Sequence, residues 1–448
     1  MSRARAAIIL AAGLGTRMKS ELPKVLHQVG GRPMLDWAIA AASGVGCARV
    51  IVVCGVQTQA VAAHAAKQLG AGAVVVQDAP LGTAHAVRAA EGALKDFNGD
   101  AIVLYGDAPL VRAETLEAMF AKRTEKGGLA VLGFEAANPT GYGRLVLAED
   151  GAVARIVEEK DATEAERAIT LCNSGVVCAD GGVLFQLLSM VRNDNAKKEF
   201  YLTDVVGLGR SAGFATQIVL GEENQVLGVN SRGELAAAEA AFQQQARKAA
   251  MENGVTMIDP TSVFFAYDTA IANDVIIEPN VFFGPGVRIA RGARIKAHSH
   301  IEGAEIGEGA NVGPFARLRP GTKLGPKAKI GNFVEVKNAT FGERAQASHL
   351  TYVGDADVGA RANLGAGTIT CNYDGFDKYR TTIGEDAFIG SDTALVAPVK
   401  VGARAFTGSG SVITKDVADG ALAVARGRQR EIEGWADAFR ASKRKPKP

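Results

Sequence analysis

The C-terminal half of the chain places an apolar residue at every sixth position. The repeat includes Ile277, Phe283, Ile289, Ile295 and Ile301 and, after a slip of one residue, Ile306, Val312, Leu318, Leu324, Ile330 and Val336. An α-helix has a period of about 3.6 residues and a strand a period of two, so neither explains this spacing. A flat-sided solenoid does, because each six-residue segment forms one side and points its apolar residue into a narrow shared core.

Extra residues interrupt this rhythm at positions 371–380. The repeat slips near Phe341 and Val358, and it resumes at Ile383, Ile389, Leu395 and Val401. A solenoid ejects additional residues as a loop, and loops on a rigid scaffold commonly carry function. Flat-sided solenoids with this repeat resemble left-handed parallel β-helices. We therefore expect that fold over residues 254–425, followed by a C-terminal tail over residues 426–448.

The N-terminal half alternates short aliphatic runs with helical patterns. The expected buried strands cover residues 7–10, 50–53, 74–76 and 101–104, and helices such as 34–43 and 59–68 lie between them. This alternation predicts an open, Rossmann-like α/β sheet over residues 1–232 that binds ligands at the carboxyl ends of its strands. Residues 233–253 are rich in Ala, Glu and Gln and predict one long linker helix.

Composition narrows the class of protein. The chain has 50 Lys and Arg against 48 Asp and Glu, so it lacks the basic excess of a dedicated nucleic-acid binder. The basic end, residues 442–448, predicts a solvated, disordered tail. No run approaches the roughly 20 apolar residues that span a bilayer. The five cysteines are scattered, which favours a cytoplasmic protein without disulfides. We expect small-molecule substrates and neither nucleic-acid nor membrane partners.

The first chemical motif follows the first strand. It reads Gly13-Leu14-Gly15-Thr16-Arg17 and continues to Pro23-Lys24. A glycine-rich turn at this place lets backbone N–H groups approach a polyphosphate, and two cations can neutralise its oxygens. A dinucleotide-binding loop is the rival interpretation, but Met18 occupies the position of its third glycine.

Further motifs occur in order along the chain. They are Gln77 with Leu81-Gly82-Thr83, Tyr105-Gly106-Asp107, Pro139-Thr140-Gly141-Tyr142-Gly143-Arg144, Ile156-Val157-Glu158, Asn173-Ser174-Gly175 and Gly228-Val229-Asn230. With these motifs the chain resembles the sugar-1-phosphate nucleotidyltransferases. More specifically, it resembles the family of bifunctional N-acetylglucosamine-1-phosphate uridyltransferases and glucosamine-1-phosphate acetyltransferases. The resemblance runs from about Ala7 to Arg426.

The resemblance implies a uridyltransferase site in the N-terminal half. Its nucleotide- and sugar-binding residues would be Leu10, Ala11, Ala12, Gly13, Lys24, Gln77, Gly82, Thr83, Tyr105, Gly106, Asp107, Gly143, Glu158, Asn173 and Asn230. Gln77 would contact the uracil edge. Asp107 and Asn230 would ligate Mg²⁺, a cation that commonly takes only one or two protein oxygens. Lys24 and Arg17 would act in catalysis by positioning the reactants and offsetting charge.

Two arginines near these motifs carry no role in the resemblance. We expect Arg144 and Arg155 to be surface charges or charges that stand behind the site. Neither is expected to contact the substrates.

A second site is expected in the repeat region. Acetyl transfer to an amine requires that the amine lose a proton, and a neutral imidazole can accept it at physiological pH. His349 lies just before the ejected loop, and the resemblance implies that it is the general base. The implied substrate-binding residues are Arg319, Lys337, Tyr352, Asn363, Asn372 and Tyr373. The implied acetyl-CoA-binding residues are Ala366, Ser391, Ser409 and Arg426.

The resemblance thus implies a bifunctional enzyme. It would acetylate glucosamine-1-phosphate with acetyl-CoA and then couple the product to UTP with Mg²⁺, giving UDP-N-acetylglucosamine for cell-wall peptidoglycan and lipopolysaccharide synthesis. Prisms of this kind pack as trimers, so a homotrimer with acetyltransfer sites between subunits is expected. The alternative is a monofunctional sugar-1-phosphate nucleotidyltransferase whose β-helix only oligomerises. His349 in its motif and the Asn372-Tyr373 loop argue against it.

Overall fold

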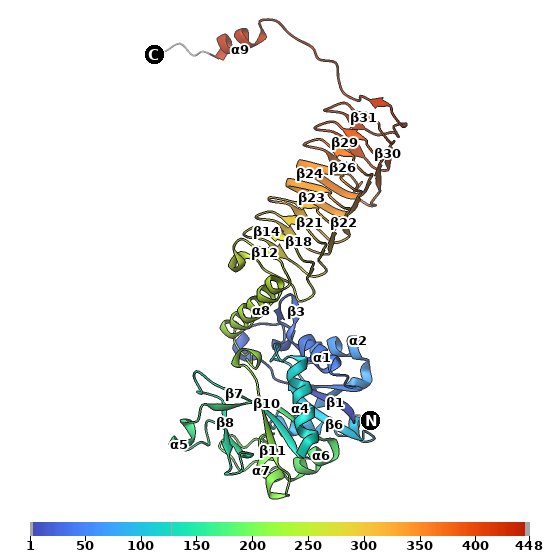
Figure 1. Cartoon of the computed structure of the whole chain (residues 1–448). Helices are drawn as coiled ribbons and strands as arrows, with labels where there is room; N and C mark the ends of the chain where they lie inside the picture. Colours follow the sequence, from blue (N-terminus) through green and yellow to red (C-terminus); the bar gives the residue numbers. More distant parts are fainter. Residues whose placement is uncertain (1–2, 127, 444–448) are drawn as a thin grey trace. The chain divides into compact units, whose positions relative to one another are not determined.

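The computed structural model describes residues 3–126 and 128–443, so the predicted basic tail lies outside the described residues from residue 444 on. The chain forms two compact units, Met1–Ala246 and Arg247–Pro448 (Figure 1). The division falls within helix α8 (Arg232–Glu252), where the linker helix is expected. The domain boundaries drawn from the sequence stay predictions, because the units divide inside this helix rather than at its ends.

The first unit is built on one mixed sheet with the strand order β11-β7-β10-β6-β1-β4-β5. Its strands are β1 (Ala4–Ala11), β4 (Arg49–Gly55), β5 (Val74–Gln77), β6 (Gly99–Tyr105), β7 (Leu129–Glu135), β8 (Gly143–Leu147), β9 (Val153–Val157), β10 (Leu171–Asp180) and β11 (Thr216–Leu220). The four strands predicted from the sequence are parallel neighbours, since β1 pairs with β4 and β6, and β4 with β5. Strand β10 runs antiparallel to β6 and β7, which the alternating pattern did not indicate.

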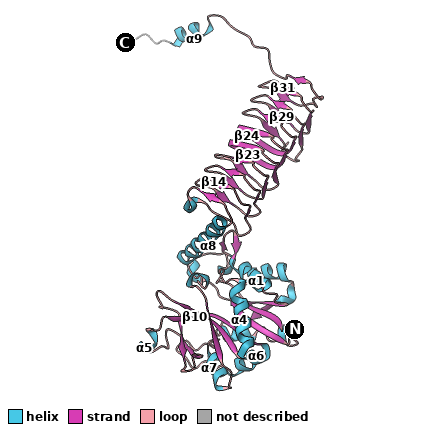
Figure 2. Ribbon diagram, viewed as in Figure 1, coloured by secondary structure: helices cyan, strands magenta, loops and turns pink. Residues whose placement is uncertain are grey.

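Helices cover both faces of this sheet (Figure 2). They are α1 (Met34–Gly44), α2 (Gln59–Leu69), α3 (Thr83–Arg88), α4 (Ala113–Lys126), α6 (Gly181–Met190) and α7 (Asp204–Ser211), and a short α5 (Glu164–Arg167) follows β9. Side chains of β1 alternate between the two faces. Ile8 and Leu10 pack with α3, α6 and α7, whereas Ile9 packs with α1, α2 and α4. Burial on both faces explains why these strands read as continuous aliphatic runs.

The carboxyl ends of β1 and β6 meet at one edge of the sheet. Beyond β1 the chain enters two short 3₁₀ turns, η1 (Thr16–Met18) and η2 (Lys24–Leu26), and a small hairpin of β2 (Gln28–Val29) and β3 (Arg32–Pro33). The Gly106 amide donates to the Leu10 carbonyl at 2.9 Å, which ties the ends of the two strands together. Polar residues that follow β1 and β6 are therefore brought to the same edge, as expected for a nucleotide-binding sheet.

The second unit is a parallel β-helix. Strands pair with the third strand after them, as β13 (Ala270–Ile271) does with β16 (Arg288–Ile289) and β16 with β19 (Ala304–Ile306). One coil therefore has three sides and takes 17 or 18 residues, as Ile271 with Ile289 and Ile289 with Ile306 illustrate. Figure 1 shows the strands stacked along this unit. Every apolar residue of the predicted six-residue repeat is buried, which confirms the interpretation of the pattern.

The remaining strands of the β-helix are mostly two or three residues long. Before the long strands they are β12 (Thr256–Met257), β14 (Ile276–Ile277), β15 (Phe282–Phe283), β17 (Arg294–Ile295), β18 (His300–Ile301), β20 (Asn311–Val312), β21 (Arg317–Leu318) and β22 (Thr322–Leu324). After them come β25 (Asn363–Leu364), β26 (Ile369–Cys371), β27 (Thr381–Ile383), β28 (Phe388–Ile389), β29 (Ala394–Val396), β30 (Val399–Val401), β31 (Phe406–Thr407), β32 (Val412–Ile413) and β33 (Leu422–Ala423).

Two long strands and one loop mark the middle of the β-helix. Strands β23 (Lys329–Phe341) and β24 (Gln346–Val358) each have 13 residues and pair along their length. Val358 pairs with Ile383, 25 residues later, so this coil is longer than its neighbours. The extra residues form the predicted loop after β26. Helix α9 (Trp435–Lys443) lies within the expected C-terminal tail. None of the described helices is long and apolar enough to cross a membrane.

Candidate active sites

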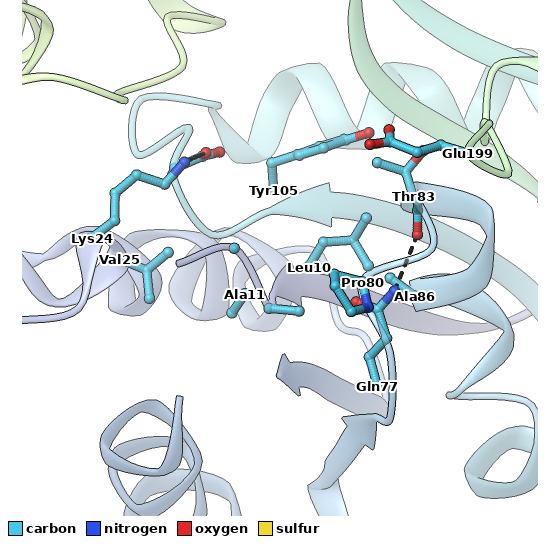
Figure 3. Close-up of a pocket in the computed structure, with 14 residues that line it drawn as sticks. Leu10, Ala11, Lys24, Val25, Gln77, Pro80, Thr83, Ala86, Tyr105 and Glu199 are labelled. Carbon is cyan, nitrogen blue, oxygen red and sulfur yellow. Dashed lines mark hydrogen bonds and ion pairs between the residues drawn. The ribbon is translucent and has the colours of Figure 1, made fainter. Parts of the chain in front are cut away.

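A cavity of about 280 Å³ opens at the carboxyl edge of the sheet in the first unit (Figure 3). Of the residues expected to bind the nucleotide, it is lined by Leu10, Ala11, Ala12, Gly13, Lys24, Gln77, Gly82, Thr83, Tyr105 and Asp107. Val25, Pro80, Ala86 and Glu199 complete the lining. Residues from three strand ends and from the glycine-rich turn therefore converge on one space.

Lys24 lies at one end of this cavity and is 9% exposed. Its ammonium ion-pairs with Asp107 and donates to Asn230 Oδ1 at 2.9 Å. Gly15 makes room for the lysine stem, because a Cβ at Gly15 would lie 2.5 Å from Lys24 Cβ, and its φ of +64° suits glycine. The Val229 amide donates to the Asp107 carbonyl at 2.9 Å, which holds the Asn230 segment beside the cavity.

The Asp107 and Asn230 oxygens meet at one cationic atom, the Lys24 ammonium. A carboxylate and an amide oxygen are the hard donors that Mg²⁺ accepts, so this pair fits such a cation. The residues that the structure describes contain no cluster of three or more His, Cys, Asp or Glu side chains that could hold a metal. A metal at this site would therefore depend on oxygens of its substrates and of water for the rest of its coordination shell.

Gln77 is buried at the far side of the cavity. Its Nε2 donates to the Gly82 carbonyl at 3.2 Å. Gly82 has a φ of +115°, and a Cβ there would lie 2.5 Å from the Phe200 carbonyl. The Leu202 amide also donates to Thr83 Oγ1 at 2.9 Å. The segment at Gly82 and Thr83 therefore packs closely against the segment from Phe200 to Leu202, which only glycine at residue 82 permits. This packing orients Gln77 through its hydrogen bond to the Gly82 carbonyl.

A second cavity of about 260 Å³ adjoins the first, and Thr83, Tyr105 and Glu199 line both. Its other lining residues are Gly141, Tyr142, Gly143, Glu158, Asn173, Ser174, Gly175, Lys197, Tyr201 and Thr203. This set contains the three residues expected to hold the N-acetylglucosamine group, Gly143, Glu158 and Asn173. Figure 3 shows Tyr105 between Lys24 and Glu199 in the first cavity.

Burial dominates the electrostatics of the second cavity. It raises the pKa of the Glu158 carboxyl, although Thr203 donates to its Oε1 at 3.3 Å. Burial and the nearby negative charges of Glu158 and Asp161 raise the pKa of Asp204 to about 6. Burial likewise raises the pKa of Tyr105 well above its ordinary value. A polar substrate would enter a region of low dielectric, in which hydrogen bonds are strong.

Three arginines near the motifs lie outside the lining of both cavities. Arg17 is exposed on η1 and does not line either cavity. Arg144, expected either at the surface or behind the site, is 1% exposed and ion-pairs with Glu159 at 2.6 Å. Its guanidinium also donates to the Tyr142 and Arg167 carbonyls inside the sugar-side loops, so it lies behind the cavity lining rather than at the surface. Arg155 is exposed, as expected, and pairs with Glu166.

In the second unit, His349 lies on β24 opposite Asn332 on β23. The imidazole Nδ1 lies 2.7 Å from Asn332 Oδ1, and the ring is exposed. An exposed ring held on one side only leaves its other nitrogen open to a substrate.

A cluster of cations lies on the same coils. The positive charges of Lys378 and Arg319 lower the pKa of Lys337. Arg319 also pairs with Glu335 at 2.8 Å. Two of these cations were expected from the sequence, whereas Lys378, on the ejected loop, was not. Cations that repel one another in this way form a ready binding site for an anion such as a phosphate.

The ejected loop is anchored to the β-helix by a buried carboxylate. Asp355 accepts hydrogen bonds from Asn372 on the loop and from Asn338, the latter at 2.5 Å. Burial raises the pKa of the Asp355 carboxyl, but these hydrogen bonds and the nearby charge of Lys378 more than offset it, so the pKa lies below its ordinary value. Tyr373 is exposed next to Asn372.

The remaining expected residues lie on neighbouring coils. Tyr352 and Asn363 are half-buried. The carbonyls of Ala366, Ser391 and Ser409 accept, in turn, from the Asp392 amide, the Gly410 amide and the Arg426 guanidinium, each at 2.7 Å. The residues expected to bind acetyl-CoA therefore form one continuous row along successive coils, in which Ser409 contributes its backbone carbonyl.

Several site residues were missed by sequence reasoning. They are Lys197, Glu199, Tyr201 and Thr203 in the sugar-side cavity and Asn332, Asp355 and Lys378 in the β-helix. The first four belong to a mixed polar and aromatic run without a recognisable spacing. Asn332 and Asp355 follow only from the strand register, which the six-residue period could have supplied once the coils were aligned.

Comparison with known proteins identifies the class of this molecule. A family model described as a MobA-like NTP transferase domain matches residues 7–170, and a model of the bacterial transferase hexapeptide, six repeats, matches residues 380–415. The chain is therefore a transferase that joins a nucleotidyltransferase domain to a hexapeptide-repeat β-helix. A likeness to a solved UDP-glucose pyrophosphorylase complexed with UDP-glucose is weak, with 19% identity over 54% of this chain, 99% of that chain and a TM-score of 0.44.

Full-length relatives identify the family. Proteins named "Bifunctional protein GlmU" match from Maricaulis maris (61% identical over 99% of this chain and 98% of the relative), Caulobacter vibrioides (58%, 99% and 96%) and Paramagnetospirillum magneticum (52%, 97% and 96%). The chain belongs to this family of bifunctional enzymes. The resemblance inferred from the motifs is thereby confirmed, and the monofunctional alternative is not favoured.

Proposed function

We propose that the first unit transfers a uridylyl group from UTP to N-acetylglucosamine-1-phosphate and that the β-helix first acetylates glucosamine-1-phosphate. The observation that carries the proposal is the pair of adjoining cavities that share Thr83, Tyr105 and Glu199. One cavity presents Lys24 and a glycine-rich turn to a polyphosphate. The other presents buried polar groups to a sugar, so the phosphates of the two substrates would meet between them.

In the uridylyl transfer, a phosphate oxygen of the sugar phosphate attacks the α-phosphorus of UTP. A P–O bond forms, and the bond to the departing pyrophosphate breaks. Lys24 would neutralise phosphate charge, and Arg17 would reach the phosphates from the exposed side of the turn. Asp107 and Asn230 would hold Mg²⁺, which supplies further charge neutralisation when bound. Gln77 would contact the uracil edge.

In the acetyl transfer, His349 would accept a proton from the glucosamine amine as the nitrogen attacks the thioester carbonyl. A C–N bond forms and the C–S bond breaks. The proton then passes from the imidazole to the coenzyme A sulfur, so the products are an amide and a free thiol. The attacking form is the neutral amine, because an ammonium has no lone pair, and without a base the nitrogen would keep its surplus proton after the attack.

The cations of the β-helix support glucosamine-1-phosphate as the substrate. Lys337, Arg319 and Lys378 would bind its phosphate, whose negative charge relieves their mutual repulsion. Tyr352 and Asn363 would orient the sugar. Asn372 and Tyr373 would contact it from the loop. The row of Ala366, Ser391, Ser409 and Arg426 would line the acetyl-CoA channel.

We further infer a homotrimer. Support comes from aromatic rings that stack on the outside of the β-helix, including Phe264 on Phe282 and Phe388 on Phe406. Each of these rings is more than 40% exposed, and such rows suit burial against other copies of the chain. In that assembly the acetyltransfer sites would lie between subunits, and the β-helix would be inactive as a monomer.

We also propose a cytoplasmic location, without nucleic-acid or membrane partners. The described structure contains only free cysteines, which agrees with a reducing compartment. The UDP-N-acetylglucosamine produced there would supply peptidoglycan and lipopolysaccharide synthesis.

The proposal is tested by incubating purified protein with glucosamine-1-phosphate, acetyl-CoA, UTP and Mg²⁺ and omitting one reactant at a time. The expected product is UDP-N-acetylglucosamine only in the complete mixture, with N-acetylglucosamine-1-phosphate alone when UTP is omitted. If N-acetylglucosamine-1-phosphate must be supplied ready-made and no thiol is released from acetyl-CoA, the enzyme is a monofunctional nucleotidyltransferase.

A further inference from the structure

We propose that Asn332 is a positioning residue that holds the His349 ring in the tautomer and orientation in which Nε2 can accept the amine proton. The inference rests on the proposed acetyl transfer at His349, but it assigns a role to a residue outside the predicted site. It follows from the register of two neighbouring coils rather than from any motif.

The pairing of the two residues is set by the backbone. Asn332 on β23 lies directly opposite His349 on β24 in the parallel register. Asn332 Oδ1 is 2.7 Å from His349 Nδ1. With the Asn332 amide in this orientation, its oxygen can only accept, which assigns the ring proton to Nδ1. The lone pair of the neutral ring is then on Nε2, the nitrogen that faces away from Asn332.

The same corner of the β-helix restrains both residues. Asn332 and His349 each precede a residue with a left-handed backbone, Phe333 (φ 55°) and Leu350 (φ 48°). Strands β23 and β24 therefore bend at the same register position. The Phe333 ring stacks on Phe315 with centroids 5.2 Å apart. Thr351 Oγ1 donates to the His349 carbonyl at 2.7 Å. These contacts hold the backbone at His349 in place. The orientation of the imidazole ring on that backbone is then set by its hydrogen bond with the Asn332 amide.

The charged groups on the neighbouring strands have other partners or lie elsewhere along the strands. Strand β23 carries Lys329, Glu335 and Lys337, and Glu335 is paired with Arg319. On β24 itself, Asp355 accepts from two asparagines and Asp357 from Arg380. The next coil, residues 363–371, has no charged residue in its sequence.

The partner of Nδ1 is thus a neutral amide. A carboxylate at this place would orient the ring equally well, but it would also stabilise the protonated imidazole, which cannot act as a base. An amide supplies orientation without that charge.

Two substitutions test whether Asn332 acts by accepting a hydrogen bond from His349 Nδ1 or in some other way. Asn332→Leu removes the oxygen that accepts the hydrogen bond. Asn332→Asp keeps an accepting oxygen but removes the N–H donors of the amide. The matched control is Asn311→Leu on β20, an asparagine on the coil before β23 whose register partner is Lys329. For each variant, release of the coenzyme A thiol gives kcat, the KM for glucosamine-1-phosphate and the pH profile. Uridylyl transfer in the same preparation reports the folding of the first unit, and the KM for glucosamine-1-phosphate reports the integrity of the β-helix site.

The expected result is a fall in kcat of about 10- to 100-fold for Asn332→Leu with little change in KM, typical of losing a residue that orients a functional imidazole. Asn332→Asp should remain active, and its acid-side midpoint should move to higher pH because the carboxylate favours the imidazolium. Asn311→Leu should match the unchanged protein. Unchanged kcat in Asn332→Leu, or equal losses in the Asp and Leu variants, would overturn the inference, the latter because Asn332 would then act as a donor.

A second measurement does not depend on activity. Nitrogen NMR of ¹⁵N-histidine-labelled protein at pH 8, with His349→Ala to assign the signal, distinguishes protonated Nδ1 from protonated Nε2. We expect the Nδ1–H form in the unchanged protein and its loss in Asn332→Leu. A predominant Nε2–H form would overturn the inference even if acetyl transfer is normal. Absence of acetyl transfer in the unchanged protein, with the Nδ1–H form present, would overturn the proposed function and leave the pairing intact.

Discussion

The Lys24 ammonium is ion-paired with Asp107 and also donates to Asn230, so one cation joins the glycine-rich turn to two oxygen donors from distant parts of the sequence. Both side chains of the ion pair are largely shielded from water. Electrostatic interactions are strong in such a setting, and a phosphate that enters the cavity would meet a cation whose position is already fixed.

Replacement of this lysine should therefore affect the uridylyl transfer selectively. We expect Lys24→Ala to lower kcat for UDP-N-acetylglucosamine formation by about 10²- to 10³-fold, as removal of a preorganised charge-stabilising group does. Acetyl transfer in the same preparation should be unchanged. Lys95→Ala, which removes an exposed lysine of the same unit, is the control. Comparable losses in both activities would contradict the separation of the two sites.

Gly82 is expected to be intolerant of a side chain. A methyl group there would lie 2.5 Å from the Phe200 carbonyl, on a backbone with φ of +115°. Gly82→Ala should lower the free energy of unfolding by about 1–3 kcal/mol and raise the KM for UTP, because Gln77 donates to the Gly82 carbonyl. Gly72→Ala, where nothing lies within 4 Å of the added carbon, is the control for urea unfolding and for kinetics. A normal KM for UTP in Gly82→Ala would contradict the proposed role of Gln77 in nucleotide binding.

His349→Ala should abolish most acetyl transfer and spare uridylyl transfer. Loss of a general base costs about 10²- to 10⁴-fold in rate. Thiol release from acetyl-CoA measures the first activity, and pyrophosphate release with N-acetylglucosamine-1-phosphate measures the second. Acetylation at the normal rate by this variant would exclude His349 as the base.

The carboxyl of Asp204 should make stability depend on pH. Burial, together with Glu158 and Asp161, raises its pKa in the folded chain from 3.8 to about 6. The folded state therefore binds this proton more tightly than the unfolded state, so the carboxyl imposes no penalty below about pH 4 and a full penalty above about pH 6. Asp204→Asn removes the penalty.

We expect the Tm of Asp204→Asn to exceed that of the unchanged protein at pH 8 and to match it near pH 4. Asp150→Asn, at an exposed carboxylate, should show no such difference. A Tm difference that is the same at both pH values would show that the raised pKa does not contribute.

The period of the apolar residues was sufficient to predict the β-helix. Ile277, Ile295 and Val312 are all buried because a three-sided coil places every sixth residue inside. Burial on both faces of the sheet likewise made β1 and β6 recognisable as aliphatic runs. The antiparallel β10 was missed because a buried strand has the same composition in either direction.

The sites were only partly predictable. Residues in the motifs that carry the resemblance, such as Gly13 and Gln77, line the first cavity. Glu199, Lys378 and Asn332 were missed because they reach their sites through tertiary packing and strand register. For Arg144 the choice between the surface and a place behind the site stayed open, because sequence alone does not show that Glu159 and two carbonyls compensate its buried charge.

The central claim is that two separate sites act in sequence, and Asp107→Ala tests it most directly. The variant is supplied with glucosamine-1-phosphate, acetyl-CoA, UTP and Mg²⁺, and the sugar phosphates and sugar nucleotides are quantified by chromatography. The account predicts that N-acetylglucosamine-1-phosphate accumulates in an amount equal to the thiol released, without UDP-N-acetylglucosamine. Formation of UDP-N-acetylglucosamine at the rate of the unchanged protein, or failure to release thiol, would contradict it.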